Sequence, residues 1–237
     1  MSTRRTVLTG IAGAALAGGS LLAVPGIASA SVRPNTFATA KVQLETQLTN
    51  RTTQLSRLSA DVAAAKTLTA AHVIALDANI ATATTNITAL VTSVQAATTG
   101  AELRADRASM VKQNRVYAVL TPQVFETIEA DQVSSQVVTF QASEPTLQSS
   151  VNLLVGQAGY KTAENHYLSF VKNVNQANEN ATNVATEVLL QTPADYPADT
   201  HVFVKANKSL LAADIALAHA TYDESVIGLA SGGYTGS

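Results

Sequence analysis

The segment that decides the fold is residues 42–97, VQLETQLTNRTTQLSRLSADVAAAKTLTAAHVIALDANIATATTNITALVTSVQAA. Its apolar and small residues form two series in which successive members are three, four or seven positions apart. The series are Leu44, Leu48, Leu55, Leu58, Val62 and Ala65, then Val73, Leu76, Ile80, Ala83, Ile87, Leu90, Val94 and Ala97. This spacing is typical of a narrow apolar seam along an α-helix. Because such a helix buries nothing until a partner covers its seam, we expect long helices that pair lengthwise.

The segment between the two series decides how these helices are connected. The spacing slips at residues 67–69, and Thr69 is a good N-cap for a helix that begins at Ala70. We therefore expect a tight turn between two antiparallel helices, residues 36–66 and 70–97. The alternative is one continuous helix with a four-residue stutter, since no Gly or Pro forces a turn here.

The remaining chain predicts further helices. The expected helices are 101–121, 122 to about 142, a short one within 147–155, 162–191, and a last one between a proline-containing loop at 192–199 and Gly228. Thr121 and Pro122 predict a helix restart, and Ser143, Glu144 and Pro145 predict a second break.

The stretch 115–125 is the expected buried centre. The expected seams of the last two long helices are Leu168, Val171, Val174, Ala181, Ala185 and Val188, and Leu211, Ile215, Ala218, Tyr222, Ser225 and Leu229.

The predicted fold class is all-α, with elongated antiparallel helical hairpins in a coiled-coil-like bundle of about six helices. The domain organisation follows from the same pattern. We expect a signal peptide at 1–30, an N-terminal helical hairpin at 31–100, central helices at 101–160, a C-terminal helical hairpin at 161–230 and a flexible tail at 231–237.

The N-terminus predicts export from the cytoplasm. Arg4 and Arg5 precede an uncharged stretch, and Ala28 and Ala30 form a small-x-small cleavage site before Ser31. The paired arginines resemble the twin-arginine export signal, although Val7 stands where that signal prefers Phe; the general secretory route is the alternative. An uncleaved membrane anchor is disfavoured by the glycines within the stretch and by the cleavage site.

Composition narrows the function classes. Charged residues make up 14% of the chain, aromatic residues 5%, and there is no Cys. Without residues 1–30 the chain has 13 basic against 17 acidic residues, a formal charge of about −4. This charge disfavours nucleic acid and anionic membranes as partners. No other stretch is long and apolar enough to span a bilayer, so we expect a protein that is secreted or held at the cell envelope.

No residue pattern in the sequence indicates a catalytic, cofactor-binding or metal-binding site. None of the four histidines, His72, His166, His201 and His219, pairs with another His at metal-ligand spacing. His219 and Asp223 are four residues apart but too few to hold a metal, and we interpret the histidines as surface or helix-pairing residues. Glu126, Glu129 and Asp131 cluster on one predicted helix, where a solvated acidic face is the favoured interpretation. Tyr196, between Pro193 and Pro197, is the one residue singled out as a possible partner contact.

Two stretches carry a family resemblance. The segments RVYAVLTPQV, residues 115–124, and LQTPADYP, residues 190–197, resemble uncharacterised secreted Ala-rich helical-hairpin proteins of actinobacteria. The resemblance implies an exported helical fold and no assigned catalytic residues.

The sequence therefore predicts an exported, non-enzymatic structural or binding module that contacts a protein or cell-surface component through helix faces, with self-association as a further possibility. The alternative is a helical-bundle enzyme or metal-binding protein whose site combines distant acids, such as Glu126 and Glu129, with a His. An enzyme would require several polar groups that converge in one concave site.

Overall fold

The computed structural model describes residues 36–196 and 200–232. The predicted export residues Arg4, Arg5, Ala28 and Ala30 lie outside these ranges. The described part is all-α, as predicted, and contains no strand. Its elements are α1 (Thr36–Ala64), α2 (Ala70–Ala96), α3 (Gly100–Lys112), the π-helix η1 (Val116–Leu120), α4 (Thr121–Asn152), α5 (Tyr160–Ala181), α6 (Val184–Leu189) and α7 (Thr200–Gly232).

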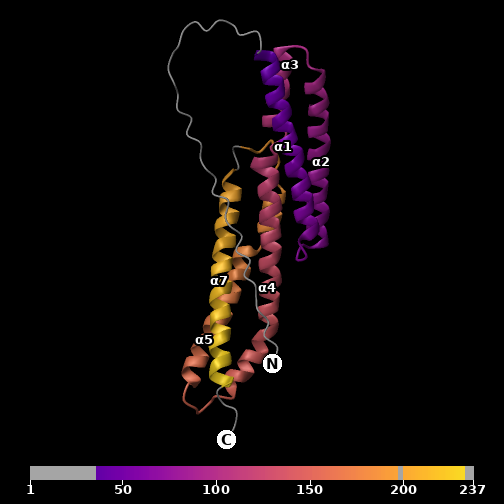
Figure 1. Cartoon of the computed structure of the whole chain (residues 1–237). Helices are drawn as coiled ribbons and strands as arrows, with labels where there is room; N and C mark the ends of the chain where they lie inside the picture. Colours follow the sequence, from indigo (N-terminus) through magenta and orange to yellow (C-terminus); the bar gives the residue numbers. More distant parts are fainter. Residues whose placement is uncertain (1–35, 197–199, 233–237) are drawn as a thin grey trace, which may run out of the picture. The chain divides into compact units, whose positions relative to one another are not determined.

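Helices α1 and α2 lie side by side (Figure 1) and share one apolar core. The leucines of the first predicted seam and the aliphatic residues of the second are buried there, from Leu44 to Val62 and from Leu76 to Val94. The Lys41 ammonium, near the start of α1, donates hydrogen bonds to the carbonyl oxygens of Gln95 (2.7 Å) and Ala97 (3.2 Å) at the end of α2. The two helices are therefore antiparallel. The chain turns between Ala64 and Ala70, where the Thr69 hydroxyl caps α2 by accepting from the His72 amide.

The expected buried centre at 115–125 is only partly correct. Val116, Val119, Leu120 and Val124 are buried, whereas Tyr117 and Phe125 are about half exposed. The preceding helix also ends earlier than predicted, at Lys112, and a π-helix replaces its last turn.

The predicted break at Ser143–Pro145 is wrong, because α4 continues through Pro145 to Asn152. Proline costs the helix one backbone hydrogen bond. Buried residues on both sides of it, Val137, Leu147 and Val151, pack into the same core and hold the helix together. Tertiary packing here outweighs the local signal.

The predicted helix 162–191 is divided in two. Asn183 takes a left-handed conformation (φ 66°), which ends α5 and starts α6. Asparagine tolerates this conformation better than most residues. The Thr182 hydroxyl donates to the Asn178 carbonyl oxygen (2.6 Å) and satisfies one of the last acceptors of α5.

Helices α4, α5 and α7 pack together around a second apolar core (Figure 1). Its largest pair is Phe140 and Phe170, which meet edge to face with ring centroids 5.7 Å apart. The predicted seam of α7 is wrong: Leu211, Ile215, Tyr222 and Leu229 are all more than half exposed. The buried face consists of Ala206, Leu210, Ala213, Ala216, Leu217, Ala220 and Ile227. The alanines let the helices approach closely, so the smaller face is the one that packs.

Leu168, in the predicted seam of α5, is likewise exposed, whereas Val174 and Ala181 are buried. None of the described helices combines the length and the apolarity that crossing a membrane requires.

Candidate functional site

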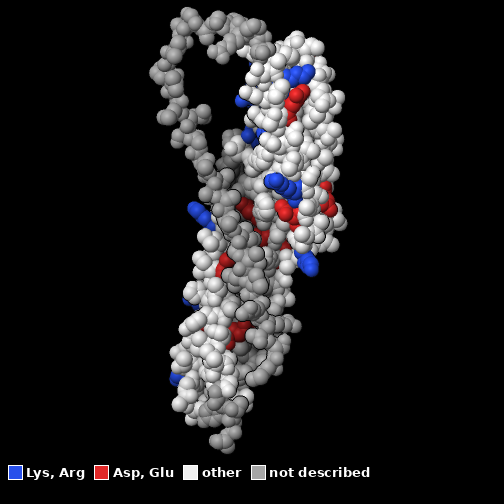
Figure 2. All heavy atoms as spheres, in the orientation of Figure 1, with Lys and Arg blue, Asp and Glu red and all other residues white. Residues whose placement is uncertain are grey.

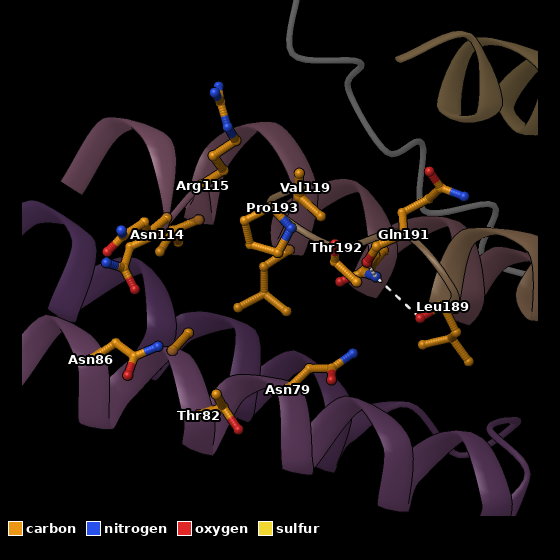
Figure 3. Close-up of a pocket in the computed structure, with 15 residues that line it drawn as sticks. Asn79, Thr82, Asn86, Asn114, Arg115, Val119, Leu189, Gln191, Thr192 and Pro193 are labelled. Atoms are coloured by element: carbon orange, nitrogen blue, oxygen red, sulfur yellow. Dashed lines mark hydrogen bonds between the residues drawn. The ribbon is translucent and has the colours of Figure 1, made fainter. Parts of the chain in front are cut away.

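A small pocket of about 160 Å³ opens where α2, η1 and the segment after α6 meet. It is lined by Asn79, Thr82, Ala83, Asn86, Gln113, Asn114, Arg115, Val116, Val119, Leu120, Gln123, Leu189, Gln191, Thr192 and Pro193. Figure 3 shows Asn79, Thr82 and Asn86 along α2 on one side, facing Asn114, Val119 and Pro193 on the other. The lining therefore combines side-chain amides with an aliphatic surface.

The π-helix shapes one wall of this pocket. The Leu120 amide donates to the Arg115 carbonyl oxygen (3.4 Å), and the Thr121 amide donates to the Val116 carbonyl oxygen. Donor and acceptor are five residues apart in both bonds, which defines a π-turn. Pro122 follows and has no amide hydrogen to continue the regular α-helical series across this turn. Such π-turns are frequent at functional sites because they redirect side chains. Here the turn directs Val116, Val119 and Leu120 toward the interior.

Gln123 fixes the opposite wall. Its Nε2 donates to the carbonyl oxygens of Val188 (2.9 Å), Leu189 (3.4 Å) and Gln191 (2.6 Å). The first two carbonyls belong to the last turn of α6, where carbonyl oxygens lack partners within the helix, and the third belongs to the segment that follows. One buried amide on α4 therefore holds the end of α6 in place and positions Gln191, Thr192 and Pro193 at the pocket.

Asn114 presents an unpaired acceptor at the pocket. Its side chain is only 6% exposed. Among the described residues its single side-chain hydrogen bond is a weak one, from Nδ2 to the Ser109 carbonyl oxygen at 3.4 Å. No hydrogen bond to its Oδ1 is present among the described residues, and this oxygen is still reached by solvent. The Asn114 Oδ1 is thus available to accept a bond from a donor in the pocket.

Among the described residues that line the pocket, Arg115 is the one with an ionisable side chain, and its charge is directed elsewhere. Its guanidinium carbon lies 4.2 Å from the centroid of the Tyr196 ring, a cation–π distance. Figure 3 shows the side chain extending away from the pocket. Tyr196, singled out from the sequence as a possible partner contact, is half-buried and attaches the loop after α6 to η1. Its interaction with a partner stays a prediction.

The two stretches that carry the family resemblance meet at this pocket. Residues 115–124 supply Arg115, Val116, Val119, Leu120 and Gln123, and residues 190–196 supply Gln191, Thr192 and Pro193. No pattern in the sequence predicts that these two stretches meet, or that Asn114 and Gln123 belong to the site. The one sequence feature that pointed to this region was the helix restart predicted at Thr121 and Pro122, which lies directly after the π-helix.

The expected solvated acidic face on α4 is wrong. Glu126 is 8% and Asp131 6% exposed. Burial, and then the charge of Glu129, raises the pKa of Glu126 to about 8, and its Oε2 has no hydrogen-bond partner. Burial also raises the pKa of Glu129, with a further contribution from the charge of Asp214 on α7. The acids face the neighbouring helices because α4 is covered on several sides, which its own periodicity does not reveal.

Two of the four histidines pair helices, as interpreted from the sequence. The His72 Nδ1 on α2 contacts Asp131 Oδ2 on α4 at 2.8 Å, and this same oxygen accepts from the Thr69 amide at 2.7 Å. His166 on α5 contacts Asp223 Oδ1 on α7 at 2.7 Å. Each pair places one buried carboxylate between two helices.

Neither histidine–aspartate pair belongs to a larger cluster of possible metal ligands among the described residues. Within residues 36–196 and 200–232, no three His, Cys, Asp or Glu side chains are grouped so that they can hold a metal ion. The nearest groups to the pocket are amides and hydroxyls, and the Thr192 hydroxyl already donates to Asp195 Oδ2 at 2.7 Å. This arrangement suits hydrogen bonding to a ligand better than proton transfer or nucleophilic attack. In comparisons with protein-family models, curated proteins and solved structures, no match to the chain was found.

Proposed function

We propose that this protein is an exported, non-enzymatic helical binding module of the cell envelope or the extracellular space, and that it binds a small uncharged molecule in the pocket between α2, η1 and the segment after α6. The observation that carries this proposal is Asn114, a residue only 6% exposed whose solvent-accessible Oδ1 accepts no hydrogen bond from the described residues at the pocket. A ligand with an N–H or O–H group would satisfy this acceptor.

The pocket lining defines the ligand's chemistry. Its described residues include no carboxylate, lysine or histidine to balance a ligand charge, and the Arg115 guanidinium is stacked on Tyr196. The volume of about 160 Å³ is similar to that of a cavity of about 150 Å³ that admits benzene. The aliphatic surface of Val119, Leu120 and Leu189 favours an apolar body. The ligand class is therefore a single neutral ring that carries at least one hydrogen-bond donor.

Ligand-observed NMR tests this proposal with phenol, 2-pyridone and benzamide as neutral probes and benzoate and benzylammonium as charged ones. We expect the neutral probes to bind and benzylammonium to bind at least about tenfold more weakly, since none of the described lining residues is an acid. Ala83→Leu fills the pocket from α2 and should abolish binding, whereas Ala89→Leu, exposed on the same helix, should not. Failure of every neutral probe to bind, or binding that survives Ala83→Leu, would contradict the proposal.

Export is part of the same proposal and rests on residues 1–30. Sequencing the N-terminus of protein recovered outside the cytoplasm should give Ser31 as the first residue. Replacement of Arg4 and Arg5 together by Lys should stop export if the twin-arginine route is used, and leave it unchanged if the general secretory route is used. An intact N-terminus on the exported protein would argue for an uncleaved anchor instead.

The proposal retains the predicted organisation into helical hairpins, 31–100 and 161–230, within a bundle of about six helices. Two apolar cores support it, one shared by α1 and α2 and one that includes α5 and α7. The face in Figure 2 supports a neutral partner surface, because charged side chains are few there and both signs occur.

The alternative, an enzyme or metal-binding bundle, is favoured by one observation. Glu126 is a buried acid with a strongly raised pKa, a feature of many active sites. His72 and His166 are instead paired with Asp131 and Asp223. Calorimetric titration with Zn²⁺ and Mn²⁺ distinguishes the two functions, because stoichiometric binding abolished by Glu126→Gln would support the alternative.

A further inference from the structure

Helix α7 has two apolar faces, and only one of them is covered. At 100° per residue, the buried face centred on Ala213, Leu217 and Ala220 lies opposite a second apolar face. We call the second face the outer stripe. Its members and their exposed fractions are Val204 (54%), Leu211 (57%), Ile215 (52%), Tyr222 (60%) and Leu229 (78%).

The outer stripe has the spacing of a coiled-coil seam. Its members are separated by seven, four, seven and seven residues, which places all of them at the two core positions of one uninterrupted heptad pattern. The remaining core positions in this stretch are Lys208, Ala218 and Ser225, all exposed and none of them acidic. A single exposed leucine needs no explanation, but a heptad pattern of exposed large side chains over about seven helical turns is unusual for a surface without a partner.

We infer that the outer stripe of α7 is the interface of a parallel homodimer, so that its occupant is the same stripe of a second copy of this chain. The first argument is area. From Val204 to Leu229 the helix rises about 37 Å at about 1.5 Å per residue, and with a width of about 12 Å the two copies together bury on the order of 900 Å². This area is close to the lower limit of about 1,000 Å² for a specific interface. It predicts a reversible dimer of micromolar affinity.

The second argument is charge complementarity across the interface. Asp214 lies on one flank of the outer stripe and His219 lies on the other, where Lys205 is already paired with Glu187 of the same chain at 3.0 Å. In a parallel, in-register pair, the residue on the first flank faces the residue five positions later on the second flank of the other copy. Asp214 then faces His219 of the second copy, twice by symmetry. An antiparallel pair brings like flanks together and gives Asp214 no basic partner.

Sedimentation equilibrium of the full chain between about 1 and 200 µM tests the inference, with the chain lacking residues 1–30 measured in parallel. We expect a monomer–dimer equilibrium with a dissociation constant between about 1 and 100 µM in both. The double substitution Leu211→Glu and Ile215→Glu should raise this constant at least about thirtyfold. The matched control is Val138→Glu, a valine 64% exposed on α4 and outside the outer stripe, which should leave it unchanged. Equal helical content by circular dichroism would show that all variants fold.

Orientation is tested with a single cysteine, because the chain has none of its own. Ser225→Cys, near one end of the outer stripe, should form an intermolecular disulfide on mild oxidation only if the helices are parallel and in register. Asp214→Lys should weaken the dimer, and a further change of His219→Glu should restore it. A chain that stays monomeric up to 200 µM, a dimer indifferent to Leu211→Glu and Ile215→Glu, or a dimer that fails to cross-link at Ser225→Cys would overturn the inference. None of these outcomes depends on ligand binding in the pocket, so this test is independent of the proposed function.

Discussion

The guanidinium carbon of Arg115, the residue that precedes η1, lies 4.2 Å from the ring centroid of Tyr196, in the segment that follows α6. This contact joins the two walls of the candidate ligand site, because residues on both sides of it line the pocket. It also explains how a loop with few apolar contacts is held against the helices.

Removal of the Tyr196 ring should loosen the segment after α6. Tyr196→Ala should lower the free energy of unfolding by about 1–2 kcal/mol, the range of a partly desolvated cation–π contact plus lost ring packing. Tyr196→Phe keeps the ring face and should cost less than about 0.5 kcal/mol. Urea unfolding followed by circular dichroism measures both. An equal loss for the two variants would mean that the hydroxyl group, and not the stacking, matters.

Glu126 should make stability fall as the pH rises. Its folded-state pKa of about 8 is above the ordinary value of 4.5, so the stabilising protonated form is fully present below about pH 4.5. Its contribution is lost as the pH rises through about 8, at up to about 1.4 kcal/mol per pH unit. Glu126→Gln, which stays uncharged, should remove the Glu126 part of this decline in urea titrations between pH 5 and 8.5, and leave a smaller decline because the pKa values of Glu129 and Asp214 are also raised. The exposed Glu179→Gln is the control and should leave the decline in place.

Replacement of the adjacent residues Leu210 and Leu211 on α7 should lower the free energy of unfolding by very different amounts. Leu210 is fully buried and Leu211 is 57% exposed. Leu210→Ala should destabilise the fold by about 2–4 kcal/mol because it leaves a cavity between helices, whereas Leu211→Ala should cost less than about 1 kcal/mol in the monomer. Thermal unfolding at sub-micromolar concentration keeps self-association out of the comparison. Similar losses for the two variants would contradict the observed orientation of α7.

The buried carboxylate of Asp131 should be important for the connection between α1 and α2. It accepts hydrogen bonds from the His72 ring and from the Thr69 amide. Asp131→Ala leaves both donors without a partner and should cost about 2–4 kcal/mol. The exposed Asp77→Ala, on α2, should cost less than about 0.5 kcal/mol. Hydrogen exchange at the Thr69 amide provides a local measurement, since it should accelerate in the Asp131 variant alone.

Several features of the fold were predictable from residue spacing because they depend on local periodicity. The narrow seams from Leu44 to Val62 and from Leu76 to Val94 are buried as predicted, since each helix has a single apolar side. The break in apolar spacing at 67–69 coincides with the turn between α1 and α2. One continuous helix could not keep its apolar seam facing one partner across such a break. Thr69, the predicted N-cap, accepts the expected bond from His72.

The candidate site was not predictable in the same way. Asn114, Gln123 and Arg115 lie far in sequence from Asn79 and Gln191, and no periodic pattern connects them. Their convergence depends on a π-turn and on the bonds that one buried glutamine makes to the end of α6. These are interactions between elements, which composition and spacing do not describe.

By itself the sequence determined that the described chain is helical and which sides of α1 and α2 are buried, because amphipathic spacing acts within each helix. The tertiary structure alone decided that Glu126 and Asp131 are buried, that α4 continues through Pro145 and that the alanine-rich face of α7 packs inward. The physical reason is that a helix such as α7, with two apolar faces, can bury either one. The choice depends on which face lets α4 and α5 approach most closely, and that is a property of all three helices together.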